Sequence, residues 1–112
     1  MIPSEKDRAL HIINAIDRIS HFTLNTDEFA FMENEMLRDA VLYQFIIIGE
    51  AILYIEKEKL SRYSYPWHLV RRFRNYIAHE YFGINMKMVW ETIVRDLPKL
   101  KIAVEEVLQK EF

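Results

Sequence analysis

The chain has 112 residues, of which 51% are apolar, and its formal net charge is −2. This length suits one domain over residues 1–112 with one hydrophobic core, and the apolar share excludes intrinsic disorder. The chain has no cysteine, which excludes disulfides and thiolate metal sites and is typical of a reducing, cytoplasmic compartment. The acidic balance excludes a uniformly basic polyanion binder, so any nucleic-acid contact must come from a local patch.

The sequence predicts long helices and no membrane attachment. Only 2 glycines and 3 prolines occur, and no segment alternates as a strand does. The longest apolar run, 45–48, is too short to span a bilayer, and the polar N-terminus lacks the pattern of a signal peptide. No Gly-rich phosphate loop or paired metal-ligand spacing occurs. We therefore expect an all-α fold, an up-and-down bundle of four to five main helices, with no metal and no cofactor.

Caps and apolar periodicity predict the helices of the first half. Ser4 is expected to cap a helix from Glu5 to about Phe22, Thr26 or Asp27 to cap a short helix through Phe29 and Phe31, and Asn34 to cap a helix from Glu35 to about Ser61. That last helix has a wide apolar face, which indicates burial on two sides. His11 and His21 are expected to be ordinary surface histidines.

Gly49 interrupts this wide apolar face. A glycine inside a helix costs about 1 kcal/mol relative to alanine, so we expect that Gly49 allows another helix to approach closely. Glu50 follows it directly. Two interpretations of Glu50 stay open, a catalytic carboxylate or a boundary residue paired with a cation, and we favour the second.

Proline and glycine divide the second half of the chain. Pro66 is expected to open a helix, with Gly83 ending it in the left-handed conformation. Asn85 is expected to cap a further helix that continues to the C-terminus. Pro98 must kink or restart that helix, and Asp96 is a candidate cap for the restart.

The stretch 71–83 gathers three arginines, a histidine and tyrosines, with no acid before Glu80. The arginine fork suits phosphate oxygens, and histidine exchanges protons near neutral pH. These side chains together are what a site needs to hold a phosphodiester and to move a proton on it. The alternative interpretation of this basic patch is a solvated cationic face.

Helical geometry separates the two main candidates, Arg74 and His79. They are five residues apart and point roughly 140° away from each other, whereas Asn75 and His79 share a face. Three arrangements would bring Arg74 and His79 together. The arginine side chain sweeps round, the helix frays near His79, or a second subunit supplies the missing group, which is the arrangement we favour.

The order of Arg74, four residues, His79, one residue and Tyr81 resembles the signature of the HepT-like family, a branch of the HEPN superfamily of small helical proteins. Asparagine directly after the arginine is also common in that family. The resemblance covers roughly residues 4–110 in order and in spacing. Its flanking segments are 37–41, 48–51, 66–67, 81–84, 89–93 and 96–98.

The resemblance implies a homodimeric, metal-independent ribonuclease that acts as the toxin of a toxin–antitoxin pair. The implied antitoxin is an MntA-like nucleotidyltransferase that transfers AMP to the motif tyrosine, here Tyr81. On this interpretation Arg74 stabilises the scissile phosphate of RNA and His79 acts as general base or acid. Asn75 orients one of these two side chains, Tyr81 lines the same cleft, and Arg71 and Arg72 add phosphate-binding charge.

Two alternatives to the ribonuclease stay open, because the same residues would bind a phosphate with or without cleaving it. In the first, the protein is a non-catalytic nucleotide-binding or adaptor subunit that partners a nucleotidyltransferase. In the second, it is a structural dimer in which Arg74 and His79 bind an acidic partner.

Overall fold

A computed structural model describes residues 2–112, and Met1, the first residue of the predicted domain, lies outside the described residues. No strand occurs within residues 2–112, which confirms the predicted all-α class. The four long helices are α1 (Glu5–Phe22), α3 (Glu35–Ile52), α5 (Trp67–His79) and α7 (Leu97–Glu111). The short ones are α2 (Glu28–Glu33), α4 (Lys57–Ser61), α6 (Met86–Glu91) and a π-helical turn, η1 (Thr92–Asp96).

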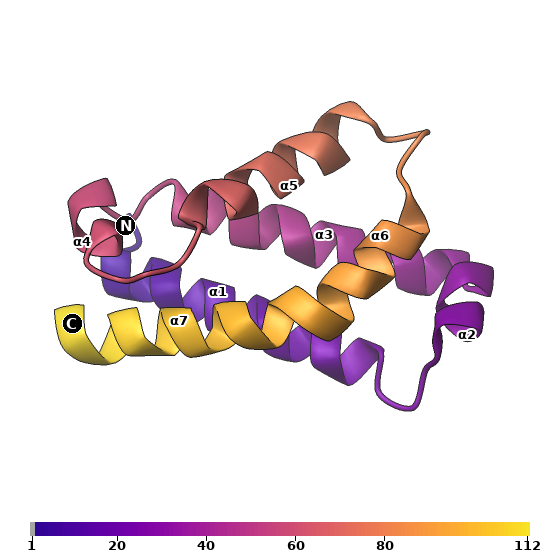
Figure 1. The fold of residues 1–112 in the computed structure, drawn as a ribbon, viewed down its shortest axis with the longest axis horizontal. Coiled ribbons are helices and arrows are strands. Elements are labelled where there is room, and N and C mark those ends of the chain that lie inside the picture. The colour runs from indigo at the N-terminus through magenta and orange to yellow at the C-terminus, as the bar shows by residue number, and fades with distance from the viewer. Residues whose placement is uncertain (1) are drawn as a thin grey trace.

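The long helices form a row in the order α5, α3, α1, α7, with alternating direction (Figure 1). Helix α5 packs mainly on α3 and lies at one edge of the row, and α7 packs on α1 at the other edge. The segment α6–η1 carries the chain from the far end of α5 back to α7, and both chain ends lie at the same end of the molecule (Figure 1). None of the helices in residues 2–112 is long and apolar enough to cross a membrane.

The hydrophobic core lies where α3 is covered by its neighbours. Most of the predicted apolar stripe of α3 is buried, and it belongs to one core cluster with buried isoleucines of α1 and buried valines of α7. The side chains with the least exposure include Ile12, Ile16, Ile19, Phe31, Val41, Ile48, Ile77, Val89, Val104 and Val107. Burying each such aliphatic side chain contributes about 1.5–3 kcal/mol.

Local side-chain caps begin four of the helices, as the sequence predicted. The hydroxyl of Ser4 accepts a hydrogen bond from the Asp7 backbone N–H at 3.1 Å, and the Asp7 carboxylate accepts one from the Ser4 N–H at 2.9 Å. Asp27, Asn34 and Asn85 accept from the backbone N–H three residues ahead, at 2.8, 3.0 and 3.1 Å. Each such cap contributes about 1 kcal/mol.

The predicted single helix from Glu35 to about Ser61 is wrong, because α3 ends at Ile52 and a turn separates it from α4. The N–H groups of residues 53–55 donate to carbonyls three residues back, which tightens and ends the helix. Tertiary contacts explain the turn. It buries Ile55, and Glu5 of α1 accepts hydrogen bonds from the Glu56 backbone N–H at 3.4 Å and from Lys59 at 2.6 Å.

Two predicted features of the second half are also wrong. Helix α5 ends at His79, no glycine in residues 2–112 has a positive φ, and the Gly83 N–H instead closes a turn onto the Glu80 carbonyl at 2.8 Å. Asp96 makes no capping hydrogen bond, since its backbone is already helical rather than extended. Pro98, which lacks an N–H donor, is accommodated by the π-helical turn before it, and the helical path continues into α7.

The C-terminal end of α7 is tied to the segment before α5. The Glu111 carboxylate accepts a hydrogen bond from the Tyr63 hydroxyl at 2.5 Å and also pairs with Arg62. The hydrogen bond to Glu111 raises the pKa of Tyr63 to about 12, because the bond stabilises the protonated phenol. The Trp67 indole N–H donates to the Leu60 carbonyl at 2.9 Å, which ties the start of α5 to α4.

Candidate active site on helix α5

Gly49 sets how closely α5 approaches α3. A Cβ atom built on Gly49 would lie 2.1 Å from Cβ and 2.5 Å from Cγ of Arg74. Any other residue at this position would therefore overlap the base of the Arg74 side chain. The predicted close helix approach is confirmed, and the residue that uses the space is the arginine of the motif.

The contact with Gly49 directs the guanidinium of Arg74 to the next residue of α3. Nη2 of Arg74 donates to the Glu50 carboxylate, and Nη1 donates to the Asn75 side-chain oxygen at 3.1 Å. The predicted pairing of Glu50 with a cation is confirmed. The side chains of Arg74 and Glu50 are 28% and 40% exposed, so this ion pair adds at most about 1 kcal/mol to stability. Its main effect is on the orientation of the guanidinium.

An anion can still reach Arg74. An arginine carries five N–H donors, and each Nη of Arg74 uses one of its two on a neighbouring side chain. Nε is buried, with no hydrogen-bond partner in residues 2–112. The second N–H on each Nη is thus what a phosphate would contact.

His79 and Tyr81 lie at the opposite end of α5 from Pro66. His79 is the last helical residue and is exposed, and Tyr81 follows in the turn with 66% of its surface exposed. The Tyr81 ring packs edge-on against Phe82, with 5.1 Å between centroids. Neither side chain makes a hydrogen bond within residues 2–112, so both are free to contact another molecule.

The turn after α5 is held in place by a tyrosine inside the motif stretch. The hydroxyl of Tyr76 accepts a hydrogen bond from the Asn85 backbone N–H at 2.9 Å. This bond joins the last turn of α5 to the start of α6 and spans the loop that carries Tyr81. The loop is therefore anchored at both ends.

The remaining arginines of the stretch have different surroundings. Arg71 is half-buried, and its Nε is buried with no hydrogen-bond partner in residues 2–112. Arg72 is exposed and lines a cavity of about 790 Å³ between α5 and the α6–α7 segment, whose walls are mostly apolar. Tyr65, Leu69, Phe73, Tyr76 and Met88 are among its lining residues.

The structure brings some of the predicted site residues together and keeps others apart. Arg74 and Asn75 are in contact, and of the two orienting roles considered for Asn75 the contact is with the arginine. His79 keeps helical backbone geometry as the last residue of α5, and the Arg74 side chain is turned toward Glu50 rather than round the helix. Two of the three arrangements for closing an Arg74–His79 pair are therefore not adopted within this chain.

One polar residue that sequence reasoning overlooked is Gln44 on α3. It is 6% exposed, the one buried polar or charged residue among residues 2–112. A glutamine within an apolar stripe, between Val41 and Ile48, is the signal that would have singled it out.

An all-helical bundle whose edge helix carries an arginine, a histidine and a tyrosine in this order defines a HEPN-like helical protein. The chain belongs to the ribonuclease HepT-like family, whose sequence profile matches residues 12–107. The resemblance stated from the motif and its flanks is thereby confirmed. No solved structure gives a significant match to the chain.

Several curated proteins are similar to this chain along most of its length. A protein of Caldanaerobacter subterraneus subsp. tengcongensis named "Putative RNase" is 39% identical over 82 residues, covering 72% of this chain and 73% of that protein. The "Probable ribonuclease HepT" of Thermococcus cleftensis is 33% identical over 99 residues, or 88% and 90% of the two chains. The "Gamma-glutamylcyclotransferase and putative RNase" of Methanocaldococcus jannaschii is 35% identical over 100 residues, but this chain spans only 44% of its length.

The Gly49 contact predicts the effect of adding one methyl group. Gly49→Ala gains about 1 kcal/mol of helix propensity, but the new Cβ overlaps Cβ and Cγ of Arg74 and must push α5 away, at a cost of about 1–3 kcal/mol. We expect a lower free energy of unfolding in urea, by up to about 2 kcal/mol. In the control, Gly83→Ala, the nearest atom is 3.9 Å away, so the change should be within about 0.5 kcal/mol. A Gly49→Ala variant that is more stable than the wild type, as the gain in helix propensity alone would make it, would contradict the contact.

Proposed function

We propose that this protein is a metal-independent endoribonuclease, the toxin of a HepT–MntA type toxin–antitoxin pair. The observation that carries the proposal is the position of the Arg74 side chain. Its guanidinium is oriented by hydrogen bonds to Glu50 and Asn75 and retains free N–H donors. His79 and Tyr81 are exposed at the end of the same helix. Membership of the ribonuclease HepT-like family supports the assignment.

In the proposed reaction Arg74 binds the scissile phosphate and stabilises the charge that builds on its oxygens. His79 takes the proton of the ribose 2′-hydroxyl as its oxygen attacks phosphorus, or gives a proton to the 5′-oxygen as that P–O bond breaks. The products are a 2′,3′-cyclic phosphate and a 5′-hydroxyl. Arg71 and Arg72 add positive charge along the backbone of the RNA.

We propose that the active form is a homodimer with α5 of each chain facing the two-fold axis. Helix α5 is the edge of the helix row, and exposed apolar side chains lie on it and just after it, with Leu69 47% and Phe82 99% exposed. A second copy would cover these side chains. Within one helix Arg74 and His79 point roughly 140° away from each other. The second copy would therefore also supply its His79 to Arg74 of the first.

We further propose that Tyr81 is the residue to which an MntA-like nucleotidyltransferase antitoxin adds AMP. The exposed hydroxyl at the end of α5 is accessible to another enzyme. An attached AMP would bring a phosphate that competes for Arg74 and an adenosine that fills the space required by RNA. Both effects oppose substrate binding without unfolding the protein.

The dimer predicts a molar mass of twice the 13.6 kDa chain mass in light scattering at micromolar concentration. Because Leu69 and Phe82 are expected in the interface, replacing both with serine should shift the mass toward one chain. A matched double replacement of exposed apolar residues elsewhere, Leu24 and Phe29, should leave it unchanged. A wild-type monomer at this concentration would defeat the proposal.

The ribonuclease mechanism predicts that His79→Ala and Arg74→Ala each lower the cleavage rate by about 10²–10⁴-fold with the fold intact. Cleavage of RNA should persist in excess EDTA. His21→Ala, which removes an exposed histidine of α1, is the matched control and should retain activity. Cleavage that stops with chelator and returns with Mg²⁺ would make the metal-free mechanism wrong. Pure RNA binding with no cleavage would favour the non-catalytic adaptor.

The switch on Tyr81 predicts that Tyr81→Phe escapes neutralisation, because it keeps the ring but loses the acceptor oxygen. Wild type, Tyr81→Phe and Tyr54→Phe are each co-expressed with the cognate nucleotidyltransferase, and intact and peptide masses locate any AMP. Tyr54 is a comparably exposed tyrosine, at 57% against 66%, so its variant should be modified and silenced like the wild type. AMP on another residue, or equal silencing of Tyr81→Phe, would remove Tyr81 from this role.

A further inference from the structure

The carboxylate that pairs with Arg74 comes from another helix. No acidic residue occurs between residues 62 and 79, so α5 has no carboxylate of its own to pair with its arginines. Glu50 of α3, 24 residues before Arg74, supplies one. Gly49, directly before Glu50, leaves room for Cβ and Cγ of Arg74. Two consecutive residues of α3 therefore contact both ends of this side chain, the glycine at its base and the glutamate at its guanidinium.

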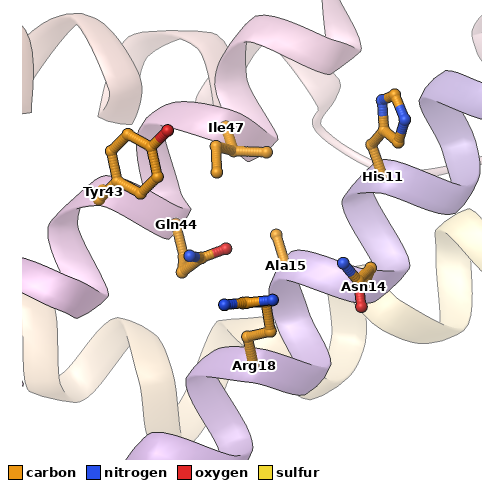
Figure 2. A pocket seen from close by; sticks show the side chains of 7 residues that line it. All are labelled: His11, Asn14, Ala15, Arg18, Tyr43, Gln44 and Ile47. Carbon is orange, nitrogen blue, oxygen red and sulfur yellow. The ribbon is translucent and has the colours of Figure 1, made fainter.

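Other arginines near α3 have no such partner. Arg71 lies one turn before Arg74 on α5. Arg18 of α1 lines a cavity of about 360 Å³ between α1 and α3, together with Tyr43 and Gln44 (Figure 2). Neither Arg71 nor Arg18 lies within salt-bridge distance of a carboxylate in residues 2–112. An arginine of this bundle therefore does not require a carboxylate, and of the three arginines of α5 only the one in the motif has one.

Stability does not account for the pair. The side chains of Arg74 and Glu50 are 28% and 40% exposed, and ion pairs that solvent reaches to this degree stabilise a protein little. Orientation is the better explanation, because the guanidinium is held from two helices, by Glu50 and by the Asn75 side chain at 3.1 Å. Without Glu50, its one remaining side-chain hydrogen bond in residues 2–112 would be to its own neighbour on α5. The carboxylate is thus the contact that fixes the guanidinium relative to α3.

The negative charge of Glu50 has a second consequence. A phosphate that binds Arg74 must share the guanidinium with this carboxylate or displace it, since both anions seek the same donors. Glu50 therefore acts as an internal competitor that weakens the binding of any anion to Arg74, a cleaved product included. Binding that is equally tight for substrate and transition state does not raise kcat, so weak binding of the ground state is compatible with fast turnover.

We propose that Glu50 is a positioning residue that holds the Arg74 guanidinium in one orientation and competes with phosphate for it. Both effects belong to the folded protein and are measurable without cleavage. Their consequence for turnover rests on the ribonuclease function proposed above.

Two variants separate the two roles. Glu50→Gln removes the charge but keeps an oxygen that accepts from Arg74, and Glu50→Ala removes both. The ligand is a short oligodeoxynucleotide, which lacks the 2′-hydroxyl that the proposed cleavage requires. In calorimetric titrations both variants should bind it at least about threefold more tightly than the wild type. Glu91→Gln is the matched control, since Glu91 is 43% exposed and pairs with Arg95 at 3.7 Å. It makes the same change in net charge at a different ion pair and should leave the affinity unchanged.

Nitrogen-15 relaxation of the Arg74 Nε–H group reports the orientation of the side chain, and the signal is assigned by its absence in Arg74→Lys. Its order parameter should fall in Glu50→Ala and stay at the wild-type value in Glu91→Gln. With RNA as substrate, Glu50→Ala should lower kcat at least about tenfold, whereas Glu50→Gln should lower KM with kcat little changed. A merely structural glutamate would instead lower the melting temperature without tightening anion binding.

Oligodeoxynucleotide affinity that is unchanged or weaker in both Glu50 variants would overturn the competition. An Arg74 order parameter that Glu50→Ala leaves unchanged would overturn the positioning role. A wild-type protein that cleaves no RNA would contradict the proposed ribonuclease, and the binding and relaxation measurements would still decide the role of Glu50.

Discussion

The close packing of α5 against α3 at Gly49 is the contact on which the candidate active site depends. A missing side chain on one helix makes room for the base of Arg74 on the other. Helix α5 packs mainly on α3, so the contact at Gly49 largely sets the position of the motif helix. A glycine inside a helix costs about 1 kcal/mol of stability. At this position it also lets α5 approach closely, which fixes the base of the side chain that is proposed to hold the phosphate.

The charges at the contact between α3 and α5 orient the Arg74 side chain and leave some of its N–H donors available to a ligand. Glu50 is partly exposed, so its ion pair with Arg74 is worth at most about 1 kcal/mol. A hydrogen bond from a charged donor to phosphate is of similar or greater strength, about 1.5–3 kcal/mol. A substrate phosphate can therefore share the guanidinium with Glu50 or displace it.

Helix α3 contributes to both the candidate active site and the cavity beside α1. One side carries Gly49 and Glu50 toward α5, and another carries Tyr43 and Gln44 toward α1. Both sides are built from a helix whose apolar stripe is buried in the core. A rigid central helix of this kind holds side chains more accurately than a loop does.

The sequence by itself determined the features that depend on neighbouring residues. The caps at Ser4, Asn34 and Asn85 and the apolar stripe of α3 follow from local hydrogen bonding and helical periodicity, and the structure confirms them. The motif and its flanks were enough to identify the family. The catalytic, RNA-binding and modification roles of Arg71, Arg72, Arg74, Asn75, His79 and Tyr81, and the dimer, stay predictions, because one chain without a substrate or a partner tests none of them.

Only the tertiary structure decided the features that depend on residues distant in the sequence. The end of α3 is determined by the burial of Ile55 and by contacts with Glu5 on another helix. The glycine predicted a close helix, but the neighbour, Arg74, is 25 residues away and is not specified by periodicity. Gln44 shows the same limit. Its sequence position lies within an apolar stripe, and only the packing of α1 beside α3 reveals that its amide points into a cavity rather than into the core (Figure 2).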